Sequence, residues 1–503
     1  MKLELSQQRH TSPSKVNSIS REPLDPTAYA VPLDDEASIL IRHYFTKICN
    51  IAGCFDSALN PFRTLASSMM SYSRPVYLLL QASSAAHLSR QRPEMRIKAL
   101  SLQSEAFSAV RDDIAKIQGP RRSIVSDELM ISSIIAGLTS GWYDVNDLGE
   151  SHVLGGQVLL YLWLKPQRNR LQYQQTFILG AFVYWLMISA FVVGDARASF
   201  EYQDNLLNTV NNLEISRDIM DDTDIPEHLR RIIPHPLTGF SIKLLISIGK
   251  VGSLCRIRQS RSEQSDEWEI GDTLEYKAQL VELELLDQVQ CHQTNFKDPE
   301  DPQTTIDEIL SVGEAYRCAG LLQLYTTFPQ LLQRQSLQSS RAPNFGMFSE
   351  PSLEAEMEAM ILNSRGDFTL SQHNWLRALA SHICSILISI PTNSSTRVLQ
   401  GLPVIIASTW LVNPMTPQPS ESITSDDAFE HPLLPLRTCS TTKEQWRESV
   451  RRGLHLHGEY VGLEQVSRII NIVEEIWHLD DEGGKKCDWM VVVASKGMQT
   501  LYG

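Results

Sequence analysis

The sequence predicts an all-α fold, in the form of a large irregular helical domain with long polar loops. Apolar residues recur at helical spacing along most of the chain, and few stretches show the alternation expected of strands. The 503 residues are 42% hydrophobic and 21% charged, which is enough apolar material for a large buried core. No fixed-period repeat is visible, so a regular solenoid is not indicated.

The clearest helical pattern lies near the C-terminus. It comprises Leu463, Val466, Ile469, Ile470, Val473, Ile476 and Trp477. Because these residues share one helix face, we expect that face to be buried. The substitution Ile470→Asp would then place an unpaired charge in the core and unfold the domain.

Two segments are distinguished by composition. Residues 1–33 are rich in Ser, Pro and Gln and predict a disordered N-terminal lead, whereas residues 34–503 predict one domain. Within it, flexible polar loops are expected near residues 258–272, 334–352 and 414–443.

The first helices can be placed from their boundaries. Acidic residues 34–36 suit a helix N-terminus, and they precede a face made of Leu40, Tyr44, Ile48 and Ile51. A second apolar stripe stops at Gly119-Pro120; it comprises Ile97, Leu100, Phe107, Val110, Ile114 and Ile117. Ser126 is then expected to cap the helix "DELMISSIIAGL".

Residues 177–194, "FILGAFVYWLMISAFVVG", carry no charge, so their composition is compatible with a membrane span. A helix buried inside a large helical domain has the same composition. We favour the buried helix, because this segment is isolated and its flanking charges give no orientation signal.

The chain's net charge of −14 argues against a protein that binds nucleic-acid phosphates over its whole surface. The most basic stretches are "CRIRQSR" at 255–261 and the arginine pairs at 121–122, 230–231 and 451–452. Such short runs are typical of solvated helix faces.

Eight scattered cysteines and no CxxC motif indicate a reducing compartment without disulfides. Cys49 and Cys54 lie close together, with His43 nearby. On a helix, however, His43 and Cys49 point in different directions, and a zinc site needs four converging ligands. We therefore expect the two cysteines to pack in the core.

The stretch "DDTD" at 221–224 offers clustered carboxylates of the kind that bind magnesium. In a helical chain this suggests a prenyl-diphosphate enzyme, although Ile225 and Pro226 interrupt the acidic run. A solvated acidic turn is the simpler interpretation. Since no phosphate-loop, HExxH or GxSxG motif is present, the sequence identifies no catalytic, cofactor-binding or metal-binding residue.

The stretch "LIRHYFTKICNIAGCFDSALNPFRTLASSMMSYSRPVYLLLQASSAAHLS" resembles the start of the fungal-specific transcription factor domain. The similar positions are His43 and Tyr44, Asp56, Asn60 to Arg63, and Ala85 to His87. Further segments are similar in the same order: "KALSLQSEAFSAVRDDI", "GWYDVNDLGESHVLGGQVLL", "HPLTGFSIKLLISIGKVGSLCR", "GEAYRCAGLLQLYTTF" and the C-terminal "GLEQVSRIINIVEEIWHLDDEGGKKCDWMVVVASKGMQTLY". Val153 and Gly156 replace the family's usual Leu and Ala. The resemblance implies that residues 177–194 form a buried helix.

Family members usually carry an N-terminal zinc binuclear cluster held by six cysteines, and residues 1–33 contain no cysteine. The resemblance thus implies a nuclear transcriptional regulator that lacks its own DNA-binding module. It would act through transcription-factor or coactivator proteins as a homo- or heterodimer, or through a small effector. Control of a secondary-metabolite gene cluster is one role found in the family. We expect no stoichiometric zinc, no membrane association, and no sequence-specific DNA binding by this chain alone.

Overall fold

The structure is a computed structural model. It describes residues 35–118, 124–165, 170–215, 231–237, 239, 241–261, 268–287, 296–339, 368–412, 434, 436, 441–482 and 488–502. The predicted all-α fold is confirmed: helices account for the described elements, apart from one pair of two-residue strands. These strands, β1 (Arg170–Leu171) and β2 (Glu214–Ile215), pair in parallel with Arg170 opposite Glu214. The predicted N-terminal lead lies outside the described residues.

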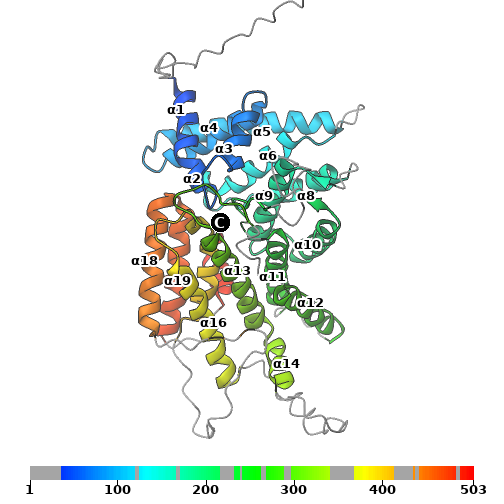
Figure 1. The fold of residues 1–503 in the computed structure, drawn as a ribbon, viewed down its shortest axis with the longest axis vertical. Coiled ribbons are helices and arrows are strands. Elements are labelled where there is room, and N and C mark those ends of the chain that lie inside the picture. Colours follow the sequence, from blue (N-terminus) through cyan, green and yellow to red (C-terminus); the bar gives the residue numbers. More distant parts are fainter. Residues whose placement is uncertain are drawn as a thin grey trace, which may run out of the picture.

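The N-terminal half of the domain lies along the top and right of the view in Figure 1. Its helices are α1 (Glu36–His43), a π-helical turn η1 (Tyr44–Ile48), α2 (Cys49–Ile51), α3 (Pro61–Met69), α4 (Arg74–Leu88), α5 (Met95–Gln118), α6 (Asp127–Leu138), α7 (Ser140–Tyr143), α8 (Glu150–Leu164), α9 (Tyr173–Ser189), α10 (Ala196–Asn211), α11 (Ile242–Arg261) and α12 (Trp268–Leu286).

The C-terminal half packs below α2 and α3 and beside α11 (Figure 1). Its helices are α13 (Ile306–Thr327), α14 (Pro329–Ser339), α16 (Leu370–Ser389), a 3₁₀ turn η4 (Ser395–Leu399), α17 (Gly401–Ser408), α18 (Lys443–Val461), α19 (Glu464–Asp481) and α20 (Trp489–Lys496). One continuous apolar core runs through both halves, so the described residues do not separate into independent hydrophobic units.

The predicted cap at Ser126 is in place, and one of the acidic residues expected at the start of the first helix, Asp35, caps that helix. The Asp35 carboxylate accepts a hydrogen bond from the Ser38 N–H at the start of α1, and the Ser126 hydroxyl accepts one from the Leu129 N–H at the start of α6. These bonds satisfy donors that the helix itself cannot pair. Of the face predicted for the first helix, Leu40, Tyr44 and Ile48 are inside the core and Ile51 is only partly buried.

The stripe predicted for α5 is wrong at its N-terminal end. Ile97 and Leu100 are 79% and 45% exposed, and the face that packs on α4 consists of Ala99, Leu102, Ala106 and Ala109. Alanine at three of these four positions lets the two helices approach closely, so the buried face of α5 is made mainly of small side chains.

Helix α9 lies at the centre of the N-terminal half, and every residue from Phe177 to Ser189 is buried. Neighbouring helices can approach α9 closely where they carry glycine. Gly137 of α6 is one such position, because a Cβ added there would fall 1.9 Å from the Trp185 side chain. Gly156 of α8 similarly faces Phe182 and Trp185, at 2.9 and 3.0 Å from such a Cβ. The predicted buried helix is therefore confirmed for residues 177–189, whereas residues 190–194 form a turn after the helix. In the part of the chain that the structure covers, no helix combines the length and apolarity needed to cross a bilayer.

The pattern predicted for α19 needs one correction. Its buried face includes Val466, Ile469, Val473, Ile476 and Trp477 as expected, but also Ile472, which is fully buried. Ile470 lies at the edge of that face and is only partly buried. A charge at position 470 can therefore turn toward solvent, and position 472 is the sensitive one.

Two of the predicted loops are shorter than expected. Helix α11 continues to Arg261 and α12 starts at Trp268, so only residues 262–267 of the 258–272 loop lie outside the described residues. Helix α14 extends to Ser339 and occupies the start of the 334–352 loop. Most of the 414–443 loop also lies outside the described residues.

Candidate functional site

Two histidines of the predicted N-terminal motif meet between α1 and α4. The Nε2 atom of His43 lies 3.0 Å from Nδ1 of His87, and Nε2 of His87 lies 3.1 Å from the carbonyl oxygen of Val461 at the end of α18. A consistent pattern has His43 donating to His87 and His87 donating to Val461. Burial, and then the proximity of His87, lowers the pKa of His43 to about 4. Burial also lowers the pKa of His87, so this pair links α1, α4 and α18 in its neutral form.

The acidic and basic residues of the same motif form an ion pair beneath α1. The Arg63 guanidinium donates to both carboxylate oxygens of Asp56, at 2.9 and 2.5 Å, and to the Phe45 carbonyl at 2.7 Å. Asn60 caps α3 by accepting from the Phe62 N–H, and its amide donates to the Phe55 carbonyl. These contacts fix the turn between α2 and α3. Asp56, Asn60 and Arg63 therefore hold the backbone of this turn in place, and their polar groups are engaged within the protein.

Cys49 and Cys54 are both fully buried in this region, as the sequence predicted. The Cys49 thiol lies 3.8 Å from the Phe62 carbonyl oxygen, and the Cys54 thiol lies 3.9 Å from that of His235. Burial raises the pKa of Cys49 to about 12 and raises that of Cys54 further. The two thiols contact different carbonyl groups in separate apolar surroundings, and among the described residues neither converges with other metal-ligating side chains.

Two arginines of the short basic stretches are used inside the domain, whereas Arg452 is exposed and residues 121–122 and 230 lie outside the described residues. Arg256 of "CRIRQSR" donates to the carbonyl oxygens of Val193 and Gly194 after α9. Arg451 binds both carboxylate oxygens of Glu474 on α19, at 2.6 and 2.9 Å. Charges occupied in this way do not form a free phosphate-binding surface.

A buried lysine links three helices next to α9. The ammonium group of Lys250 on α11 contacts Asp204 of α10 at 2.7 Å and Glu284 of α12 at 2.6 Å. Its side chain is only 2% exposed, so water hydrates the ammonium group poorly. The two carboxylates compensate for this lost hydration. Removal of either carboxylate would weaken this junction.

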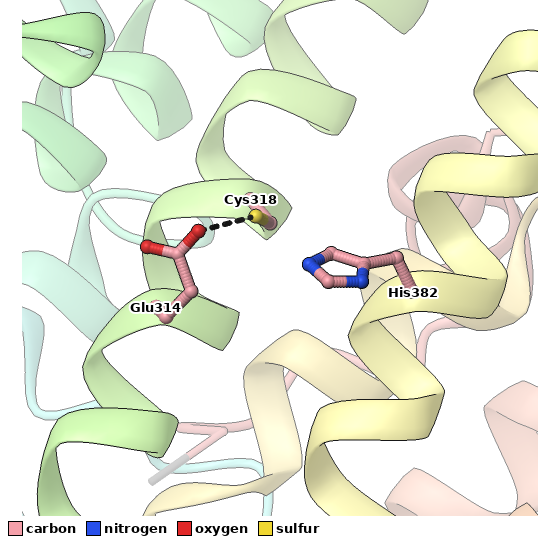
Figure 2. A group of neighbouring side chains, drawn as sticks. All are labelled: Glu314, Cys318 and His382. Atoms are coloured by element: carbon pink, nitrogen blue, oxygen red, sulfur yellow. Dashed lines mark hydrogen bonds between the residues drawn. The ribbon is translucent and has the colours of Figure 1, made fainter. Parts of the chain in front are cut away.

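One group of side chains has the composition of a metal site. Glu314 and Cys318 lie one turn apart on α13, and His382 projects toward them from α16 (Figure 2). One potential ligand atom from each residue lies within 4.8 Å of the other two. Glu314 and His382 are half-buried and Cys318 is fully buried, so the group sits at the boundary between core and solvent.

The electrostatics of this group are set by Arg317. Its guanidinium binds both carboxylate oxygens of Glu314, at 2.6 and 2.8 Å, and thereby fixes the orientation of the carboxylate. The Cys318 thiol donates to the same carboxylate over 3.4 Å. Burial and the nearby Glu314 raise the pKa of Cys318, whereas burial lowers the pKa of His382. The thiol is thus protonated and the imidazole neutral.

Sequence reasoning did not find this group. Glu314 and Cys318 share a face at four-residue spacing, but that spacing is common and His382 lies on another helix of the domain. Only the packing of α13 against α16 brings the third residue near. The signal that could have drawn attention to the pair is its place within "GEAYRCAGLLQLYTTF", one of the similar segments.

Helix α8 presents a second feature of functional interest, an apolar face directed outward. Figure 1 shows α8 on the outer side of α9. Leu154, Val158 and Tyr161 are 51%, 60% and 59% exposed. The name α8 face is used for the exposed residues of this helix and the lysine that follows it: Glu150, Ser151, Leu154, Gly155, Val158, Tyr161, Leu162 and Lys165. Large apolar side chains gathered on one exposed face are typical of protein contact sites.

The acidic stretch 221–224 lies outside the described residues, so its proposed magnesium chemistry remains a prediction. The double substitution Asp221→Ala/Asp222→Ala, assayed for magnesium-dependent turnover of a prenyl diphosphate, would test it.

A family of known proteins matches this chain. The family model "Fungal specific transcription factor domain" matches residues 38–503, which include nearly all the described residues and the similar segments found by sequence. No curated protein and no solved structure matches the chain. Because the match spans well over half of its length, the chain belongs to the fungal-specific transcription factor domain family, a family of transcriptional regulators.

Proposed function

We propose that this chain is a nuclear transcriptional regulator that acts by pairing with a second copy of itself through the α8 face, rather than through a zinc cluster of its own. Membership of the family supports the regulatory role. The exposed α8 face is the observation that supports pairing, because it leaves Leu154, Val158 and Tyr161 in water.

The cysteines support the second part of the proposal. A zinc binuclear cluster needs six clustered cysteines, and this sequence contains eight. Five of them are buried at separate positions in the helical core: Cys49, Cys54, Cys255, Cys318 and Cys384. Three cysteines remain within these 503 residues, which is fewer than a cluster requires.

The order of residues along α8 favours a second copy as the partner. If two α8 helices pack antiparallel about a twofold axis at Val158, Leu154 meets Leu162 of the second copy. Tyr161 then meets Gly155 of the second copy, where nothing lies within 4 Å of the position that a Cβ would take. A surface that matches itself in this way is the requirement for a symmetric dimer.

Charge is complementary in the same arrangement. Glu150 at the N-terminus of α8 and Lys165 at its C-terminus are exposed and have opposite signs. Antiparallel pairing brings each Lys165 near the Glu150 end of the other helix, whereas parallel pairing would place like charges together. Helix α8 is about 22 Å long, at 1.5 Å per residue. One helix pair buries less than the roughly 1,200–2,000 Å² of stable complexes, so we expect reversible, concentration-dependent association.

The test compares two valine substitutions in the full chain. Val158→Glu places a charge at the centre of the α8 face and should leave a monomer at concentrations where the unaltered chain forms a dimer. Val491→Glu, on the exposed side of α20, is the matched control and should not change the mass. Sedimentation velocity across a concentration series gives the mass of each variant. A monomeric unaltered chain, or a dimer retained in Val158→Glu, would refute pairing through α8.

Regulation in the cell requires a separate measurement. Raising the level of the chain in its host should change transcript levels, and Val158→Glu should remove that change if pairing is required. We propose a secondary-metabolite gene cluster as the target, and transcript profiling would locate it. A response that is intact in Val158→Glu would instead favour action through a coactivator or a small effector.

A further inference from the structure

We propose that Glu314, Cys318 and His382 form a binding site for one divalent transition-metal ion of the zinc class, which links α13 to α16. The inference is independent of pairing through α8, because it concerns other helices and is tested by a different measurement. It rests on the convergence of three different ligand types from two helices, which Figure 2 shows.

The separations of the side chains suit a single ion. In a tetrahedral site with metal–ligand bonds of about 2.0–2.3 Å, neighbouring ligand atoms lie roughly 3.3–3.8 Å apart. The carboxylate oxygen of Glu314 and the sulfur of Cys318 are already 3.4 Å apart. All three candidate ligand atoms lie within 4.8 Å of one another, so small side-chain rotations would bring them to one ion.

The types of ligand select the class of metal. A thiolate and an imidazole favour zinc and similar borderline-soft ions over magnesium and calcium, which prefer oxygen ligands. The three protein ligands leave a fourth tetrahedral position, which water can fill. Access is available from the surface, because Glu314 and His382 are only partly buried.

Binding exchanges a proton for the metal. The thiol hydrogen bond from Cys318 to Glu314 is lost, the sulfur binds the ion as a thiolate, and the proton leaves to water. The thiolate and the carboxylate together balance the two positive charges of the ion. Arg317 remains beside Glu314 as an additional cation, so we expect weaker binding than at a structural zinc site with several thiolates.

This proposal revises the expectation of no stoichiometric zinc. That expectation followed from the missing six-cysteine cluster and from the poor convergence of Cys49 and Cys54. Tertiary packing creates a different group elsewhere in the chain, with a capacity for one ion rather than two.

The experiment uses Co²⁺ as a spectroscopic substitute for zinc in the full chain. After dialysis against a chelator, Co²⁺ titration should saturate at one ion per chain and produce a sulfur-to-cobalt charge-transfer absorption. Zn²⁺ should then displace Co²⁺ and remove that absorption. Cys318→Ser should abolish the band, whereas Glu314→Gln and His382→Gln should each weaken binding by about 10-fold or more.

Cys384→Ser is the matched control, since Cys384 is a buried cysteine of the same helix as His382 and is absent from the ligand group. It should keep the band. Circular dichroism of each metal-free variant checks folding, and if Cys318→Ser does not fold, the partly buried His382→Gln decides the question. Failure to reach saturable binding would overturn the proposal, as would a band that survives Cys318→Ser or an affinity unchanged by His382→Gln.

Discussion

Helices α8 and α9 are neighbours in the chain and are both strongly apolar, yet the fold treats them differently. α9 is covered on every side, and its residues from Phe177 to Ser189 are all buried. α8 contributes Val153, Leu159 and Trp163 to the core but leaves Leu154, Val158 and Tyr161 in water. The comparison shows that an apolar composition makes burial of a helix favourable. How much of the helix is buried depends on the helices packed around it.

The largest expected effect comes from truncating a large side chain in α9. Phe182→Ala should destabilise the domain by about 3–5 kcal/mol, because it leaves a cavity where Phe182 now packs on Trp185. Tyr161→Ala on α8 removes a comparable aromatic group from an exposed position and should change stability by less than about 0.5 kcal/mol. Urea denaturation of both variants would measure the difference. Equal losses would mean that α8 is covered in solution.

Acidification should weaken the environment of α9 through His235. The Nε2–H of His235 donates to the Phe177 carbonyl at 2.9 Å, and its Nδ1 accepts from the Leu237 N–H at 2.9 Å. Burial lowers the pKa of His235 to about 4, from about 6.5 when exposed. The unfolded chain therefore binds a proton first as the pH falls, so stability is full above pH 6.5 and declines between about 6.5 and 4.

The expected loss from this residue is up to about 3 kcal/mol, at about 1.4 kcal/mol per pKa unit. His235→Gln, which does not titrate, should be less stable at neutral pH but lose less stability on acidification. The exposed His478 of α19 provides the control, and His478→Gln should keep the full acid dependence. Thermal melting between about pH 7.5 and 4.5 makes the measurement, because this range starts above the decline and covers most of it. If the melting temperatures of His235→Gln and the unaltered chain fell in parallel as the pH is lowered, His235 would not be a source of the acid dependence.

A smaller effect is expected at the contact between the two helices. Gly156 stands where the family usually has alanine, and an added Cβ would lie 2.9 Å from Phe182 and 3.0 Å from Trp185. Gly156→Ala should therefore cost about 1–3 kcal/mol through overpacking, despite the better helix propensity of alanine. Gly155→Ala, with open space beside it, serves as the comparison and should be neutral or slightly stabilising in the monomer. Stabilisation by Gly156→Ala would show that the aromatic pair can move aside.

Much of the N-terminal region could be predicted from the sequence. Acidic residues 34–36 located the start of the first helix and Ser126 was identified as an N-cap, because both signals depend on local residue type. Leu40, Tyr44 and Ile48 were placed by periodicity. Prediction failed on α5, since Ala99 and Ala106 carry little apolar signal but occupy the contact with α4. It was imperfect on α19, where Ile470 and Ile472 are equally apolar and only the packing of the neighbouring helices distinguishes them.

The sequence by itself determined the helical class, the family, and the burial of Cys49, Cys54 and α9. Those properties depend on local periodicity, on residue type, or on an ordered set of similar segments. Tertiary structure alone decided that α8 keeps an exposed face and that His382 meets Glu314 and Cys318. Both depend on which helices become neighbours, and that is set by the packing of side chains distant in sequence.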